Sequence, residues 1–590
     1  MSLNSELSDL FKTFAQIMEI RGESVFKAIA FSKVSRLLKD MTVDIRKAVD
    51  GGTLDQIEGI GASSRKIIEE YAKTGKSKDF EEVSATVPAG LIPMLEIPGL
   101  GPKTISLLWK ERKIESIDQL KAALSLGMLA GLKGLGDKKI KSIQDGLTLM
   151  ESHGGRVGLP TAQQIGQIML AAVRAMPGIL RAELAGSLRR AKETIGDVDI
   201  ICSTKPPVTG QTITAAFSKL PMVTKILGQG DTKASVLTSD NVQVDLRVVP
   251  DENFGAAMLY FTGSKEHNVK LRGLALDKEL TLNEWGLYKL SEYEKAAKKT
   301  GEAPKAKPVA SKSEEDVYRA LGLDFIDPEM REDRGEVVAA AKKKLPTLIT
   351  VADINGDLHN HTTASDGTAS IEEMADAAKA KGYKFLAITD HSKSQVIANG
   401  LTAERLLKHV EAIRKIGSKI KGIKLLAGCE VDILVDGRMD FDDDVLKELD
   451  IVIASPHISL KQDTAKATAR ILRAIDNKYV NVIGHPTGRL IGSREGLPLD
   501  FEPIFKAAAA SGTALEINSG YPRLDLNDIN ARGALDHGCL LSINTDAHAT
   551  DELDAMHLGV SVARRAWAEP SRVINCFSWE QLQSFLRQKR

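Results

Sequence analysis

The sequence predicts a multidomain α/β protein with all-α domains at the N-terminus, an α+β region in the middle and a βα barrel at the C-terminus. A chain of 590 residues is too long for a single hydrophobic core. Gly-x-Gly turns separate short helical stretches before residue 140, and apolar strands that alternate with carboxylates follow. After residue 350, strand-like apolar runs alternate with helical stretches, which is typical of a βα barrel.

Composition limits the classes of protein that the chain can belong to. The formal net charge is zero, but residues 101–300 carry 28 Lys and Arg against 21 Asp and Glu, a basic excess typical of contact with a phosphate backbone. No apolar run approaches the roughly 18 residues that span a bilayer. The four cysteines have no paired spacing, which predicts reduced thiols rather than a disulfide framework. A cytoplasmic protein without a membrane partner is therefore expected.

The first two predicted domains, residues 1–85 and 86–155, carry a Gly-x-Gly turn three times. Each turn precedes a helix start with a lysine nearby: Gly59, Gly61 and Lys66; Gly99, Gly101 and Lys103; Gly134, Gly136 and Lys138. One such turn is usually an ordinary helix connection, whereas three favour phosphate binding, because glycine lets the backbone approach a phosphate and free helix N–H groups bind it. The pattern resembles the helix-hairpin-helix motif, which implies sequence-independent contact with DNA. In family X DNA polymerases, which later parts of the chain resemble, the first such domain binds the 5′-phosphate of a gap and the second is the DNA-binding fingers domain, so the resemblance implies these roles for residues 1–85 and 86–155.

Carboxylates alternate with apolar residues in a strand-like run after a glycine-rich connector at Gly154-Gly155. Asp197 and Asp199 would project from one face of this strand while the residues between them enter the core. Asp245 occupies the polar face of a second such run. An Asp-x-Asp pair is more often a solvated strand face, but three such oxygen ligands suit two Mg²⁺ ions that bridge a triphosphate.

This block, together with the Gly-Ser turn ahead of it, closely resembles the nucleotidyltransferase palm of the family X DNA polymerases. The resemblance implies a palm over residues 156–250, with Mg²⁺ or Mn²⁺ held by Asp197, Asp199 and Asp245. It implies that the incoming nucleoside triphosphate is held by Gly186, Ser187 and Arg190.

An aromatic pair and a Gly-Ser turn follow the predicted palm. By themselves these residues indicate no more than packing, but at this distance they resemble the family's thumb, here residues 251–335. The resemblance implies nucleotide contacts from Tyr260, Phe261, Gly263, Ser264, Asn268 and Arg272. Within the thumb, residues 295–312 lack periodicity and predict a mobile loop, and a capped helix is expected from Ser313.

The C-terminal domain, residues 353–590 after a linker at 336–352, contains nine of the 11 histidines. Strands are expected to alternate with helices such as 371–380 and 403–415, so that ligands cluster where the strands end. Nine side chains lie at such ends, with His359 and His361 expected on one face of a strand: His359, His361, Asp366, His391, Glu430, His457, His485, Asp546 and His548. An isolated histidine is usually structural, and His409, His537 and His557 are assigned so.

These nine residues match those of the polymerase and histidinol phosphatase (PHP) domain. The resemblance implies two to three metal ions, with Glu430 bridging two of them. Mixed imidazole and carboxylate ligands favour Mn²⁺, Zn²⁺ or Fe²⁺, and clustered metals suit phosphoester hydrolysis. In similar multidomain proteins this domain implies 3′–5′ exonuclease activity, in some cases with cleavage at abasic sites or removal of 3′-phosphates.

One position departs from the family pattern. Ile67 stands where some members carry the lysine that removes deoxyribose phosphate, and Lys66 is one residue away. One residue turns a helical side chain by about 100°, which argues against lyase activity.

The order of the domains resembles that of bacterial and archaeal family X DNA polymerases. It implies a monomeric repair polymerase that uses deoxynucleoside triphosphates on gapped or primer-template DNA and carries a nuclease. Two alternatives stay open. The first is a scaffold that binds DNA ends and keeps the nuclease while its palm has lapsed, since Gln243 stands where some members carry arginine. The second is a small-molecule phosphatase, which would have no use for three phosphate-binding hairpins.

Overall fold

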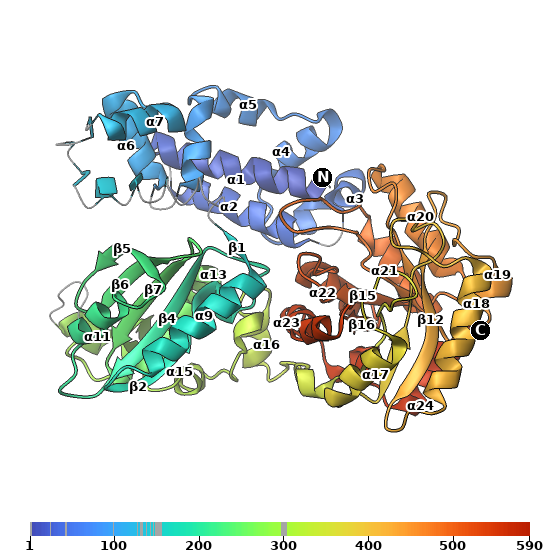
Figure 1. The fold of residues 1–590 in the computed structure, drawn as a ribbon. Coiled ribbons are helices and arrows are strands. Elements are labelled where there is room, and N and C mark those ends of the chain that lie inside the picture. Colours follow the sequence, from blue (N-terminus) through green and yellow to red (C-terminus); the bar gives the residue numbers. More distant parts are fainter. Residues whose placement is uncertain are drawn as a thin grey trace. The chain divides into compact units, whose positions relative to one another are not determined.

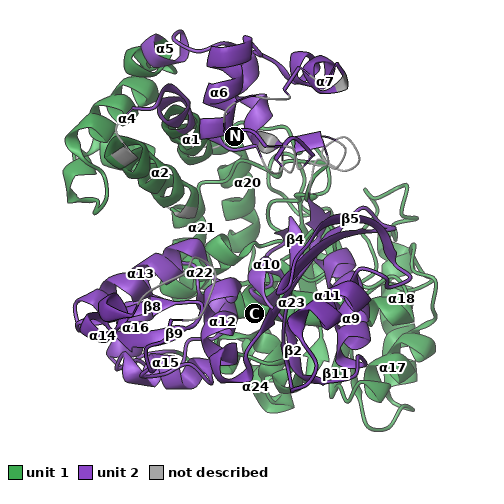
Figure 2. Ribbon diagram, turned by 90° about the vertical axis from the view of Figure 1, so that its left-hand side faces the viewer, with its two compact units in different colours: residues 1–15, 26–81, 346–590 green, residues 16–25, 82–345 purple. Residues whose placement is uncertain are grey.

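The computed structural model describes residues 3–589 except 24, 42–43, 98–99, 127, 130–131, 133, 137–138, 142, 145–146, 148–155 and 297–303. Gly99, Lys138 and the Gly154-Gly155 connector lie outside the described residues. The chain forms two compact units, one of residues 1–15, 26–81 and 346–590 and the other of residues 16–25 and 82–345 (Figure 2). The predicted domain limits stay a prediction.

The N-terminal part is helical, as predicted (Figure 1). Its elements are α1 (Leu3–Arg21), α2 (Val25–Asp40), α3 (Ile45–Asp50), η1 (Leu54–Gln56), α4 (Ala62–Thr74), α5 (Lys78–Ser84), η2 (Ala89–Leu91), η3 (Pro93–Glu96), α6 (Pro102–Arg112) and α7 (Ile117–Ser125). In the first unit Phe14 packs against Phe31 with ring centroids 4.8 Å apart and against Phe80 at 5.7 Å. An aromatic core therefore holds α2 and α5 together.

The palm is a five-stranded sheet in the order β2-β4-β7-β6-β5. Its elements are β1 (Val157–Gly158), α9 (Leu159–Arg174), β2 (Ile179–Leu184), α10 (Gly186–Arg189), β3 (Thr194–Ile195), β4 (Asp197–Thr204), α11 (Gly210–Phe217), β5 (Val223–Gln229), β6 (Lys233–Thr238) and β7 (Gln243–Val249). Strands β4 and β7 are parallel neighbours, and Asp199 stands opposite Asp245. Ile201 lies on the carboxylate face of β4 and packs against Phe254 and Met258. Helix α12 (Phe254–Thr262) therefore covers part of this face.

The thumb follows directly. It contains η4 (Asp251–Asn253), α12 (Phe254–Thr262), α13 (Lys265–Leu276), β8 (Leu280–Asn283), β9 (Gly286–Lys289), α14 (Leu290–Lys295), α15 (Glu314–Ala320), η5 (Pro328–Met330) and α16 (Glu336–Ala341). The predicted cap is confirmed, because the Ser313 side chain accepts a hydrogen bond from the backbone N–H of Asp316. The predicted mobile loop is wrong at its C-terminal end, where Ala310 is buried and its carbonyl accepts from Leu287 N at 2.8 Å.

Arg331 is the central buried charge of the thumb. It is fully buried, donates through Nη1 to Glu314 Oε1 at 2.6 Å and through Nε to the carbonyl of Ile326 at 2.9 Å. Its guanidinium also lies 5.3 Å from the ring centroid of Tyr318. The charge therefore contacts a carboxylate, a carbonyl and an aromatic face.

We expect Arg331→Met to destabilise the thumb by about 3–5 kcal/mol, because Glu314 then loses one of its two buried partners. Thermal unfolding followed by fluorescence and by limited proteolysis measures the loss. The matched control is Arg319→Met on α15, whose exposed ion pair with Asp316 is worth less than about 1 kcal/mol. Equal melting curves for the two variants would contradict a structural role for the buried pair.

The C-terminal region is a seven-stranded parallel sheet in sequential order, as the βα-barrel prediction requires. Its strands are β10 (Gly356–Asp357), β11 (Phe385–Ile388), β12 (Lys424–Asp432), β13 (Ile451–Ser455), β14 (Val482–Ile483), β15 (Ala514–Asn518) and β16 (Leu541–Asn544). A parallel bridge between Asn360 and Ala547 joins the two outer segments, so the sheet closes on itself.

Helices surround this barrel. They are η6 (Val351–Asp353), α17 (Ile371–Ala380), α18 (Ala403–Gly417), α19 (Asp443–Leu446), α20 (Thr464–Asp476), α21 (Phe501–Ser511), α22 (Asp528–Asp536), η7 (Thr550–Ala555), α23 (Met556–Arg565), η8 (Pro570–Arg572), η9 (Ile574–Cys576) and α24 (Trp579–Arg587). Leu582, Phe585 and Leu586 of α24 pack against buried strand residues such as Phe385 and Ile451, so the last helix closes the apolar core. The two predicted helices match α17 and α18.

Candidate active sites

The three palm carboxylates converge. Asp197, Asp199 and Asp245 each offer an oxygen, and these atoms lie within 4.8 Å of one another. The alternation predicted for β4 is confirmed, because Val198 and Ile200 are fully buried between the half-exposed aspartates. The parallel pairing of β4 with β7 is what brings the third oxygen to the other two.

The electrostatics of this cluster fit a divalent cation. Burial and the negative charges of Asp197 and Asp245 raise the pKa of Asp199 to about 7. Burial and Asp245 also raise the pKa of Asp197. Two cationic or polar groups already touch Asp245, since Lys233 Nζ lies 2.6 Å from Oδ2 and Gln243 Nε2 donates to Oδ1 at 2.9 Å. A bound dication would favour the ionised form of all three carboxylates.

Gly186 lies directly against this cluster. Its backbone has φ of +62°, and a Cβ at this position would stand 2.1 Å from Asp199 Oδ2. Ser187 follows in the same short turn, α10, and is half-buried. The Gly-Ser turn therefore packs directly against the Asp199 carboxylate, and its predicted contact with a triphosphate stays a prediction.

We expect Gly186→Ala to lower kcat/KM for nucleotide addition by about 100-fold, because the new methyl group displaces the Asp199 carboxylate. Steady-state primer extension measures this effect. Gly228→Ala on β5 is the matched control, since a Cβ there meets nothing within 4 Å. Unchanged extension by the Gly186 variant would show that the turn does not position the aspartate.

The two arginines after this turn connect the palm to the thumb. Arg190 Nε lies 3.0 Å from Glu332 Oε1, and its Nη1 donates to the carbonyl of Thr262. Arg189 bonds to the Thr262 hydroxyl at 2.7 Å and to Glu314 at 2.6 Å. The predicted contact of Arg190 with a triphosphate stays a prediction, and the network that holds it was not visible in the sequence.

Three of the six predicted thumb contacts share one small pocket. Tyr260, Asn268 and Arg272 line it together with residues of α12 and β8. Asn268 Nδ2 donates to the carbonyl of Tyr260 at 2.7 Å, which ties α13 to the end of α12. Phe261 instead lies under the Arg247 guanidinium, 4.3 Å from the ring centroid. The predicted nucleotide contacts of these residues stay predictions.

The Gly263-Ser264 turn connects α12 to α13. Ser264 is the N-cap of α13, where its side chain accepts from His267 N at 3.2 Å. Its own N–H donates to the carbonyl of Arg331 at 3.0 Å. The turn is thus bonded to the backbone of Arg331.

The barrel brings all nine predicted ligands together around Glu430, which is fully buried on β12. Its Oε1 lies 2.9 Å from His485 Nε2 and 3.2 Å from His457 Nε2, and its Oε2 lies 2.8 Å from His391 Nδ1. His359 Nε2 stands 3.3 Å from Oε1. One carboxylate therefore faces four imidazoles, and the bridging role that the resemblance implied for it stays a prediction.

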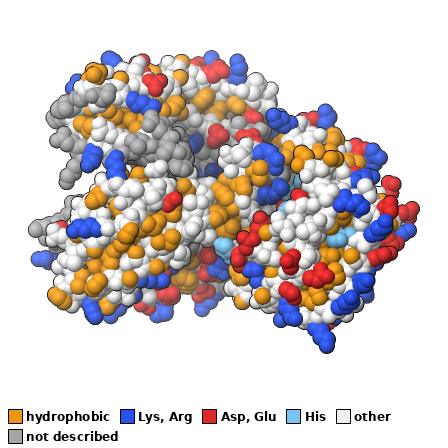
Figure 3. Space-filling view, viewed as in Figure 1, with side chains coloured by type: hydrophobic (Ala, Val, Ile, Leu, Met, Phe, Trp, Pro, Cys, Tyr) orange, Lys and Arg blue, Asp and Glu red, His pale blue; other side chains and the backbone are white. Residues whose placement is uncertain are grey.

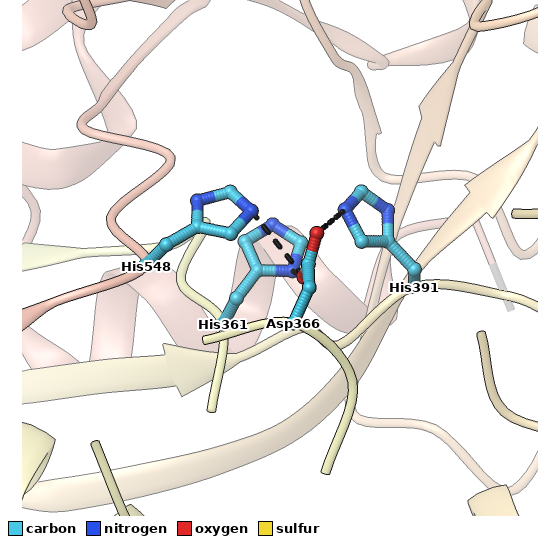
Figure 4. Close-up of side chains that lie close together, drawn as sticks. All are labelled: His361, Asp366, His391 and His548. Carbon is cyan, nitrogen blue, oxygen red and sulfur yellow. Dashed lines mark ion pairs between the residues drawn. The ribbon is translucent and has the colours of Figure 1, made fainter. Parts of the chain in front are cut away.

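The remaining ligands extend this cluster on two sides. Asp546 Oδ1 lies 3.0 Å from His361 Nε2. On the other side Asp366 lies between two imidazoles, with Oδ1 3.4 Å from His548 Nε2 and Oδ2 3.6 Å from His391 Nε2 (Figure 4). Among the described residues, three overlapping groups of candidate ligand atoms have mutual distances within 4.8 Å, and the predicted number of metal ions stays a prediction.

The chemistry of these donors fits metal ions. In the described part of the chain, buried ligand atoms such as His359 Nε2, His361 Nδ1 and Glu430 Oε2 lie close to other ligand atoms but form no hydrogen bond of good geometry. Unsatisfied buried polar atoms are costly, and coordination would satisfy them. Burial alone would raise the pKa of Glu430, but the imidazoles of His457, His359 and His391 hold it well below its usual range.

A supporting shell of side chains orients the ligands, and the sequence analysis missed it. Glu516 Oε1 contacts His359 Nδ1 at 2.8 Å, Asp432 Oδ1 contacts His457 Nδ1 at 2.5 Å, and Asn518 Nδ2 donates to Asp546 Oδ2 at 3.0 Å. Such partners fix the tautomer and direction of a ligand. The sequence did contain a signal for two of these residues. Glu516 and Asn518 are polar side chains two residues apart on β15, a buried strand that carries none of the nine ligands.

One detail of the prediction is wrong. His359 and His361 do not lie on a strand, because β10 ends at Asp357. Beyond it the backbone bonds across the barrel mouth, with His361 N donating to the carbonyl of Ala547 at 2.8 Å. His409 lies outside the three ligand groups and contacts Asp390 at 2.8 Å, in keeping with its structural assignment.

The described glycines of the hairpins lie at helix starts. Gly61 is the N-cap of α4 and Gly101 that of α6, and the carbonyl of Gly136 accepts from Lys139 N at 2.8 Å. Gly59 and Gly134 adopt φ of +100° and +91°. A Cβ at Gly61, Gly101 or Gly136 would meet nothing within 4 Å, so these turns are open to a ligand. Lys103 is exposed.

The lyase position is closed. The Ile67 side chain is 1% exposed, whereas Lys66 points outward and its Nζ lies 2.9 Å from Asp79 Oδ1. The two neighbours therefore lie on different faces of α4, as the helical rotation predicted.

The surface shows no single dominant charge on the face seen in Figure 3, where acidic and basic side chains are interspersed over the barrel. In the described part of the chain, none of the helices combines the length and apolar character needed to cross a bilayer.

Comparisons with known proteins agree with these sites. Family models match for a helix-hairpin-helix domain at residues 2–77, the DNA polymerase beta thumb at 257–332 and the PHP domain at 357–519. A part of the chain is 29% identical over 245 residues to a probable phosphatase of Thermoanaerobacter sp. (strain X514), covering 40% of this chain and 95% of that protein. A probable phosphatase of Shewanella halifaxensis is 30% identical over 246 residues, 39% and 91% of the two chains.

One similarity extends over the whole chain. The DNA polymerase/3′-5′ exonuclease PolX of Bacillus subtilis is 38% identical over 580 residues, covering 98% of each protein. Both clusters of candidate metal ligands lie within this alignment of nearly full length. The chain therefore belongs to the PolX family of DNA polymerase/3′-5′ exonucleases.

Proposed function

We propose that this protein fills short gaps in DNA during repair and trims 3′ ends with a metal-dependent 3′–5′ exonuclease in its barrel. The observation that carries the proposal is the pairing of Asp199 with Asp245 across β4 and β7, with Asp197 beside them. A separate ligand cluster in the barrel supplies the second activity. We expect a cytoplasmic monomer that acts on gapped or primer-template DNA and deoxynucleoside triphosphates.

In the palm, Asp197, Asp199 and Asp245 would hold Mg²⁺ or Mn²⁺. The metal supplies charge neutralisation for the attacking and leaving oxygens. The Gly186-Ser187 turn offers backbone N–H groups to the triphosphate beside these carboxylates. Tyr260, Asn268 and Arg272, which share one pocket, would contact the nucleotide and the new base pair. The hairpin turns at Gly61, Gly101 and Gly136 would bind the phosphates of the flanking duplex.

In the barrel, the nine ligands would hold two to three Mn²⁺, Zn²⁺ or Fe²⁺ ions, with Glu430 between two of them. The metals supply a water of lowered pKa and stabilise the leaving oxygen of a phosphodiester. Glu516 and Asp432 keep the imidazoles of His359 and His457 aligned. The likeness to probable phosphatases supports testing removal of 3′-phosphates and cleavage at abasic sites as additional reactions.

The experiment uses a gapped duplex, with and without a 5′-phosphate at the downstream end. Extension and shortening of the same labelled primer are measured together on this duplex. We expect extension that the 5′-phosphate stimulates, and shortening when nucleotides are withheld and Mn²⁺ is present. If the primer is neither extended nor shortened with any metal, the proposal is overturned.

A second candidate is a DNA-end nuclease whose palm has lapsed. It is favoured by the contacts of Lys233 and Gln243 with Asp245, which a metal ion would have to displace. Extension assays with Mg²⁺ and with Mn²⁺ separate the two candidates. Shortening without extension in both metals would favour the nuclease scaffold.

A further inference from the structure

The loop of residues 392–400 begins directly after the ligand His391 and is bonded to the metal-ligand strands at both ends. At its start Ser392 N donates to the carbonyl of Glu430 at 2.9 Å. At its end Leu401 N donates to the carbonyl of His391 at 2.8 Å, and Leu401 forms a bridge with Ser392. The loop therefore starts and finishes at the same point of the barrel mouth.

The middle of this loop is held by neighbours of other ligands. Gln395 Nε2 donates to Asp432 Oδ2 at 2.7 Å, and the other oxygen of Asp432 contacts the ligand His457. Asn399 Nδ2 donates at 3.2 Å to the carbonyl of Ser365, the residue before the ligand Asp366. The loop is thus bonded to residues that adjoin or contact three of the ligands, His391, His457 and Asp366.

The tip of this loop presents two aliphatic side chains to solvent. Val396 is 82% exposed and Ile397 is 103% exposed. Two backbone hydrogen bonds close the turn that carries them: Asn399 N donates to the carbonyl of Val396 at 3.2 Å, and Gly400 N donates to that of Gln395 at 2.9 Å. Both side chains are β-branched and therefore lose little rotamer freedom when a partner covers them.

We propose that Val396 and Ile397 form an apolar wedge that packs against the bases at the 3′ end of DNA and separates the terminal nucleotide from its pairing partner. The inference rests on the proposed exonuclease function and adds the group that meets the bases. Aliphatic side chains inserted between base steps unstack DNA, and stacking on base faces is tolerant of sequence. The wedge would leave the freed phosphodiester facing the ligands to which its loop is bonded.

The test uses the full-length protein with both side chains changed, Val396→Ser and Ile397→Ser. Three substrates are compared in the same metal: a duplex with a paired 3′ end, the same strand unpaired, and bis(p-nitrophenyl) phosphate. We expect a rate about tenfold lower on the paired end, the size of one lost base contact. We expect unchanged rates on the other two substrates, because neither requires unpairing. Val396→Leu with Ile397→Leu should restore the paired-end rate.

The control is Val351→Ser, which removes a 49% exposed aliphatic side chain elsewhere in the same unit. Equal rates for the serine variant and the unchanged protein on the paired end would overturn the wedge and leave the exonuclease standing. A parallel loss on all three substrates would also overturn it, because the loop would then support the metal site itself. If the unchanged protein shortens no DNA, the exonuclease and the wedge both fail.

Discussion

Asp245→Asn should abolish primer extension, with a loss of about 10³-fold, while 3′–5′ shortening continues at the unchanged rate. The substitution keeps the shape of the side chain and removes the charge that faces Asp199 across the two strands. One of three oxygen ligands within 4.8 Å then loses most of its attraction for a divalent cation. Single-turnover extension of a gapped primer measures the loss, and shortening of the same primer without nucleotides measures the retained activity.

The control for this prediction is Asp240→Asn in the exposed turn between β6 and β7, which removes the same charge five residues away. Its extension rate should stay unchanged. Loss of shortening in the Asp245 variant would show that the two activities share one site. Retained extension would place nucleotide transfer outside the palm cluster.

Glu430→Gln should lower the rate at which 3′ ends are shortened by about 10³-fold and leave the rate of primer extension unchanged. Glu430 is the carboxylate that four imidazoles face, and an amide in its place cannot bridge two cations. His361→Ala should produce the same separation, since His361 contacts both Asp546 and the Asp366 side of the cluster. Metal content by mass spectrometry and shortening of a labelled primer are the two measurements.

Glu411→Gln on α18 is the matched control, because Glu411 is exposed on the outside of the barrel. It should retain its metal and both activities. If the Glu430 variant still shortens DNA, this result would contradict a bridging role for Glu430. One that loses extension as well as shortening would contradict the division of labour between palm and barrel.

Much of the architecture was predictable from local patterns. The alternation in β4 predicted which residues enter the core and which carboxylates share a face, because side chains on a strand alternate between its faces. The cap at Ser313 predicted the start of α15. The nine barrel ligands follow apolar runs one after another, so their convergence followed once a parallel barrel was assumed.

Local sequence patterns did not predict contacts between residues that are distant in the chain. Arg190 contacts Glu332, and Ala310 pairs with Leu287 in a segment whose composition predicted mobility. The supporting contacts of Glu516 and Asp432 with imidazoles depend on which strands become neighbours. The sequence by itself determined which side chains share a strand face, which helices are capped and which residues are available as ligands, because these depend on backbone period and side-chain type. Only the tertiary structure decided the register of β4 against β7, the contacts of Arg189 and Arg190 with the thumb, and the position of the loop at 392–400. Each of these results from packing between segments far apart in the chain.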